Sequence, residues 1–225
     1  MFAFHFKHFS IMHNQFQKVS GISLMVSSVL LVVTMVLHPT GGDIKHIMQM
    51  HDVAITAHSL AIFSLPFVAY GFYGLSISLL TNGKISMLGF IFVCFALIAG
   101  MIAASINGLV LPMFVANYVN EFEQNSNILK PILKYGSFFN QAMDYITIIG
   151  LIITITIWSV LIIIGEKFPK WIGYYGLILF VLSLFGVFMN FNFVNLFGFR
   201  IFVFSLVSWI VLMGWLMMKN ITIKN

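Results

Sequence analysis

Charged residues are what this sequence has least of. Only 8% of its 225 residues are charged, whereas 60% are hydrophobic and the mean hydropathy is +1.03. A soluble domain of this size needs far more charge to cover its surface with polar groups. A bilayer removes that need, because the outer surface of the protein then faces hydrocarbon. The scarcity of charge therefore excludes a soluble globular protein and makes the lipid bilayer the first expected partner.

Cysteine and several catalytic motifs are also nearly or wholly absent. Cys94 is the single cysteine, which excludes an internal disulfide and any CxxC redox or zinc site. No histidine follows His58, and no GxSG, Walker, dinucleotide-binding or HExxH motif occurs. These absences exclude a rhomboid-like serine protease, a nucleotide-binding enzyme and a four-histidine dihaem core.

Long, continuous apolar runs are what the sequence does contain. A membrane-spanning helix needs about 20 apolar residues, so the chain has room for about six. Barrel strands would alternate between apolar and polar residues, and open sheets leave backbone groups unpaired in hydrocarbon. We therefore predict an all-α, six-helix bundle forming a single membrane domain over residues 1–225. The expected spans are about 19–37, 58–80, 87–115, 144–165, 171–190 and 195–218, with an outer amphipathic segment at about 43–57 and an outer loop at about 116–143.

Basic residues indicate the orientation of these spans. The first apolar run is too long for a signal peptide and ends in His38-Pro39 without a small-x-small cleavage pattern, so we expect it to be retained. Seven of the 11 basic residues fall on the side of the N-terminus, which predicts cytoplasmic termini in a bacterial cytoplasmic membrane. The seven are Lys7, Lys18, Lys84, Lys167, Lys170, Lys219 and Lys224, and the other four are Lys45, Lys130, Lys134 and Arg200. The net charge of +5 is explained by these basic residues, which set the orientation of the protein in the membrane. We therefore expect no nucleic-acid partner.

The stretch from His38 to His58 holds four of the seven histidines. Placed on a helix of about 100° per residue, residues 44–58 are amphipathic, and His51 and His58 fall within the apolar arc. Two interpretations stay open. Either the segment lies along the outer surface with His58 at the start of the second span, or both histidines face the bundle interior as ligands or proton carriers.

Metal and haem binding are the cofactor possibilities in this stretch. His51 and His58 are separated by about 10 Å along a helix, too far to share one ion. Asp43 and His46, with His38 across a Pro-Thr-Gly-Gly turn, form a His/Asp/His set that zinc accepts. A single haem between His38 and His58, or a histidine–methionine pair, is also compatible with the sequence.

Polar residues of the later spans collect near the same outer boundary. Asn107 lies about 30 Å along the third span from its inner end, Asp144 begins the fourth span, and Arg200 lies near the start of the sixth. Asp144 and Arg200 have similar depth and could pair. We therefore hypothesise an outward-facing polar pocket, lined by His51, His58, Asn107, Asp144 and Arg200.

Three classes of function fit these features. The leading hypothesis is a non-enzymatic binding or transport-related module built around the outward pocket. The second is an enzyme that uses His51 or His58 as acid or base with Asp52 or Asp144. The third is a structural subunit or homo-oligomer that docks a helix in a groove of small residues at spacing four, formed by Gly100, Ala104 and Gly108.

Overall fold

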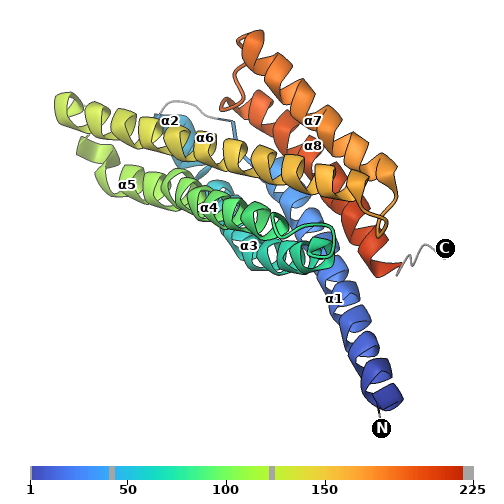
Figure 1. Ribbon diagram of the computed structural model, residues 1–225. Coiled ribbons are helices and arrows are strands. Elements are labelled where there is room, and N and C mark those ends of the chain that lie inside the picture. Colours follow the sequence, from blue (N-terminus) through green and yellow to red (C-terminus); the bar gives the residue numbers. More distant parts are fainter. Residues whose placement is uncertain (1, 41–43, 122–124, 220–225) are drawn as a thin grey trace.

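The computed structural model describes residues 2–40, 44–121 and 125–219, with side chains from Asn14 onward, and these residues contain helices and no strand (Figure 1). The helical elements are α1 (Phe2–Leu37), α2 (Ile44–Gln49), α3 (His51–Leu79), α4 (Ser86–Ser105), the π-helix η1 (Ile106–Val110), α5 (Leu111–Tyr118), the 3₁₀ turn η2 (Val119–Glu121), α6 (Ser126–Ile164), α7 (Lys170–Phe188) and α8 (Leu196–Met218). Six segments are long and apolar enough to cross a membrane, and they begin at residues 14, 51, 86, 126, 170 and 196. The prediction of an all-α, six-helix membrane protein is confirmed.

The helices pack around α1, α3 and α6. α1 packs against α3 and α8, α6 packs against α4 and α7, and α3 also contacts α4. Figure 1 shows α7 at the edge of the bundle and the N-terminal part of α1 extending beyond the other helices. A Cβ on Gly21 of α1 would lie 2.6 Å from the carbonyl oxygen of Gly214 in α8, so only glycine allows these two backbones to approach so closely.

In the half of the bundle nearer the termini, large side chains fill the space between the helices. Trp158 and Trp209 are fully buried there, and the Phe72 ring lies 5.2 Å from that of Trp158. Both indole N–H groups are satisfied, because Trp158 donates to the Ser86 carbonyl (3.1 Å) and Trp209 to the Ile172 carbonyl (3.2 Å). The internal space of the bundle therefore lies on the opposite side, which we call the outer side.

The outer loop expected at about 116–143 is instead mostly helical. α5 and η2 continue to Glu121, and α6 begins at Ser126 and runs without a break into its membrane-spanning part. With 39 residues, α6 is about 58 Å long, almost twice the hydrocarbon thickness of about 30 Å. Pro131 lies in the second turn of α6 without ending the helix, and the nearby Leu129 is buried, so apolar packing supports this outer part.

The outer amphipathic segment expected at about 43–57 is divided in two. α2 ends at Gln49, Met50 has φ −98° and ψ 9°, and α3 starts at His51. Residues 51–57 are therefore the first turns of the second membrane-spanning helix. The physical reason is that Ala54 and Ala57 are buried within the bundle, so this part of the amphipathic face packs on protein.

Candidate functional site

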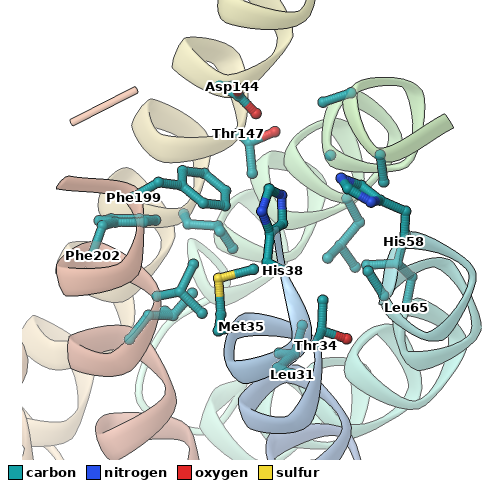
Figure 2. A pocket seen from close by; sticks show the side chains of 18 of the residues that line it. Leu31, Thr34, Met35, His38, His58, Leu65, Asp144, Thr147, Phe199 and Phe202 are labelled. Carbon is teal, nitrogen blue, oxygen red and sulfur yellow. The ribbon is translucent and has the colours of Figure 1, made fainter. Parts of the chain in front are cut away.

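A cavity of about 310 Å³ lies between α1, α3, α4, α6 and α8 on the outer side of the bundle (Figure 2). Most of its wall is apolar, including Leu31, Met35, Leu65, Phe72, Phe199 and Phe202. Polar side chains from four segments line the rest: Thr34, His38, His58, Asn107, Asn140, Asp144 and Thr147. In Figure 2, Asp144 and Thr147 lie on the same side of the cavity as the two histidines, whereas Leu31 and Met35 lie at the other end.

Two histidine rings meet at the polar end. The rings of His38, just after α1, and His58, in α3, have centroids 4.6 Å apart and planes inclined at 57°. His58 donates from Nδ1 to the Ala54 carbonyl (2.8 Å), and His38 donates from Nδ1 to the Pro39 carbonyl (2.9 Å). The backbone therefore fixes both rings by the same nitrogen, and neither Nε2 has a hydrogen-bond partner among the described residues.

His58 is held in place by Gly108. A Cβ on Gly108 would overlap the His58 ring, so the imidazole occupies the space that a side chain would need. Gly108 belongs to η1, where the Leu111 N–H bonds to the Ile106 carbonyl in the wide π pattern. Pro112 follows directly; it lacks the N–H that would bond to the Gly108 carbonyl, and its ring crowds that oxygen. A wide turn before the proline relieves this conflict and brings Asn107 and Gly108 to the site.

Asp144 places a carboxyl group within α6, one of the membrane-spanning helices. Its Oδ2 accepts a hydrogen bond of 2.8 Å from the Asn140 amide, one turn earlier in α6. Thr147, on the same face of α6, donates to the Met143 carbonyl (2.9 Å). The one ion pair among the described side chains is His51–Asp52, so no described cation neutralises Asp144. Ionisable groups at such depth are costly and usually serve a function.

Arg200 supports the site from outside the cavity wall. Its Nη2 donates to the His38 carbonyl (2.8 Å), and it makes no ion pair with Asp144, although the sequence suggested that pairing. Burial lowers the pKa of His38 from its ordinary value of 6.5; the Pro39 hydrogen bond opposes this shift, and the positive charge of Arg200 adds to it. The neutral imidazole is therefore the favoured form of His38 near neutral pH.

A second cavity, of about 910 Å³, lies further toward the outer end, between α2, the start of α3, η1, α5 and the first part of α6. Lys130, Lys134 and His46 contribute to its wall. His38, Pro39, His58 and Asn107 line both cavities. The histidine pair therefore stands at the boundary between the inner cavity and this outer vestibule.

No protein-family model, curated protein or solved structure matches this chain.

The structure brings together three of the five residues of the hypothesised pocket. His58, Asn107 and Asp144 line the inner cavity, Arg200 contacts it only through His38, and His51 lies elsewhere. The His51 imidazole bonds to Asp52 (2.8 Å), whose side chain is 98% exposed. His51 therefore belongs to the surface at the start of α3.

The small-residue stripe faces the interior of this chain. Gly100 and Ala104 line the inner cavity, a Cβ on Gly100 would contact Thr147 of α6, and Gly108 contacts His58 of α3. Its neighbours are thus α6 and α3, which leaves no open groove along these three residues for another helix. The small side chains also leave the volume of the cavity unfilled.

The structure leaves the predicted metal site untested and argues against a haem between His38 and His58. Asp43 lies outside the described residues, and His46 bonds through Nε2 to the Thr40 carbonyl (3.0 Å), so the set of His38, Asp43 and His46 stays a prediction. Within residues 14–40, 44–121 and 125–219, no three His, Cys, Asp or Glu side chains surround a common point. His38 and His58 are in ring contact, which leaves no room for a porphyrin between them.

Sequence reasoning missed Thr34, Asn140 and Thr147 as lining residues, and placed His38 only with possible metal or haem ligands. The spacing of four between Asn140 and Asp144, and between Thr34 and His38, was the available signal, because such pairs share a helix face.

Proposed function

We propose that this protein binds a small amphipathic molecule in the inner cavity, as a binding or transport-related module of the membrane. The observation that carries the proposal is a cavity with a largely apolar wall and a few polar groups converging at one end. Ligand sites have this composition, and typical volumes are about 300–1,000 Å³. An apolar chain would lie among Leu31, Leu65 and Phe202, and a polar head would lie at the histidines.

The vestibule supplies a route for the ligand. Because His38 and His58 line both cavities, a ligand passing between them moves past these two rings. The excess of basic residues on the side of the termini supports placing both termini in the cytoplasm of a bacterium. The vestibule then opens away from the cytoplasm, and the ligand arrives from the outer face of the membrane.

Filling the cavity tests the proposal. The protein is purified from native membranes, and the lipophilic molecules that accompany it are identified by mass spectrometry. In Ala104→Phe and Ala61→Phe, new rings fill the cavity from α4 and α3, and we expect the associated molecule to be lost. Ala142→Phe, at an exposed position of α6, is the matched control and should retain it. Equal recovery from all four proteins would contradict the proposal.

Acid–base catalysis is the second candidate function. His38, His58 and Asp144 line one cavity, and imidazole with carboxylate is a common acid–base combination. His58→Gln distinguishes the two functions. A binding module retains the same molecule in wild type and variant, whereas an enzyme accumulates a different, unconverted molecule in the variant.

A further inference from the structure

The two histidines at the boundary of the inner cavity leave the same ring nitrogen without a partner among the described residues. A backbone carbonyl only accepts hydrogen bonds, so Nδ1 of His38 and of His58 must carry the hydrogen that bonds to Pro39 and Ala54. In a neutral imidazole the other nitrogen is then an acceptor. Each ring therefore offers an unprotonated Nε2 with no partner among the described residues.

Asp144 adds acceptors at the same end. One carboxyl oxygen receives the Asn140 amide, and the other has no hydrogen-bond partner in the described part of the chain. Asn107 brings one donor group and one acceptor group, whereas Arg200 and the vestibule lysines do not line the inner cavity. The polar end of the inner cavity thus carries several acceptor atoms that have no hydrogen-bond partner among the described residues.

Thr34 is a further polar residue of the cavity wall, on the side of Leu31 and Met35 (Figure 2). It is 1% exposed, its Oγ1 has no hydrogen-bond partner among the described residues, and it lines the cavity one helical turn before His38. A buried hydroxyl normally has a partner, because leaving it unpaired is unfavourable. A polar group of a bound molecule would supply that partner.

We propose that the ligand head is a hydrogen-bond donor, a hydroxyl or ammonium group, that binds between His38, His58 and Asp144. This inference rests on the proposed function and specifies the chemical class of its ligand. A carboxylate or phosphate head would place lone pairs against the lone pairs of both Nε2 atoms. A hydroxyl head donates one hydrogen bond and can also accept, whereas an ammonium head donates only.

The test compares three probes that share one alkyl chain: octanediol, octylammonium and octanoate. The full-length protein, with isotope-labelled histidine, is held in nanodiscs of uncharged lipid. Nitrogen NMR follows the Nε2 signals of His38 and His58, assigned with His38→Gln and His58→Gln, and thermal unfolding is recorded in parallel. We expect both Nε2 atoms to be unprotonated, and octanediol, octylammonium or both to shift their signals and raise the unfolding midpoint.

The outcomes separate this inference from the proposed function. A response to octanediol alone assigns a hydroxyl head, and a response to octylammonium alone assigns an amine. Octanoate should change neither the Nε2 signals nor the unfolding midpoint. Ala104→Phe should abolish the response to the binding probes, whereas Ala142→Phe should keep it. Octanoate binding as well as the other probes, sensitive to Ala104→Phe, would overturn the inference and leave the proposed function standing. So would an Nε2-protonated tautomer. No response to any probe, with no molecule accompanying the purified protein, would overturn both.

Discussion

The position of His58 is decided by the residue opposite it. Gly108 has no side chain, and the imidazole fills that space while its Nδ1 is held by the Ala54 carbonyl. His58 is only 5% exposed, and a group added at residue 108 would meet its ring directly. A single methyl group at residue 108 therefore changes both packing and the polar wall.

Gly108→Ala tests this contact. Because the new Cβ would overlap the His58 ring, we expect a loss of about 1–3 kcal/mol in stability, the usual cost of overpacking. Gly136→Ala is the matched control, since a Cβ there would meet nothing within 4 Å, and better helix propensity should stabilise by about 0.5–1 kcal/mol. Unfolding midpoints in one detergent measure both, and equal midpoints for the two variants would contradict the contact.

The residues of the site were only partly predictable from the sequence. His58, Asn107 and Asp144 could be selected because polar side chains are rare in apolar spans. His38 could not be placed with them, because its position depends on the crossing of α1 and α3 and on the Arg200 hydrogen bond to its carbonyl. His51 was selected because it shares a helix face with His58, but α3 begins at His51, and the imidazole contacts Asp52 instead.

At the level of elements, the turn between α7 and α8 positions the polar groups of α8. α7 ends at Phe188; two residues later Asn190 has φ 54°, the left-handed region, and the Phe191 N–H bonds to the Gly186 carbonyl (2.8 Å). Asn195 then caps α8 by accepting from Gly198 N–H (2.7 Å). The start of α8, and with it the place of Arg200, is thus fixed by local hydrogen bonds.

Asn195→Ala should therefore weaken the start of α8. Loss of this cap is expected to cost about 0.5–2 kcal/mol. Asn195→Asp keeps an accepting oxygen at the helix N-terminus and should retain wild-type stability. Thermal unfolding of the three proteins at one pH provides the measurement, and an equal loss in both variants would speak against capping.

The type and number of the membrane-spanning helices could be predicted from the sequence, but the starts of α3 and α6 could not. Continuous apolar runs identify all six spans because hydrocarbon selects composition strongly. Residues 126–143 mix Lys130 and Lys134 with apolar side chains, a pattern that resembles a surface loop. The burial of Leu129 that accompanies helix formation there is a tertiary effect, which a single sequence does not report.

For the whole molecule, orientation decides which side supplies the ligand. With Cys94 replaced by alanine, Lys84→Cys and Lys130→Cys place single thiols at exposed positions on opposite sides of the bundle. We expect a membrane-impermeant maleimide to label Lys130→Cys in intact cells and Lys84→Cys only after permeabilisation, because positive charge favours the cytoplasmic side. The reverse labelling pattern would place the vestibule in the cytoplasm.

α6 joins parts of the molecule that are otherwise separate. The same helix carries Lys134 in the vestibule, Asp144 at the inner cavity and Trp158 in the closed core. No proline interrupts it between residues 132 and 164, so its membrane-spanning part behaves as a stiff rod. Tilting α6 to widen the vestibule would also move its other end, where Leu161 accepts the Asn82 amide. The vestibule, the inner cavity and the closed core are thus joined by one continuous helix.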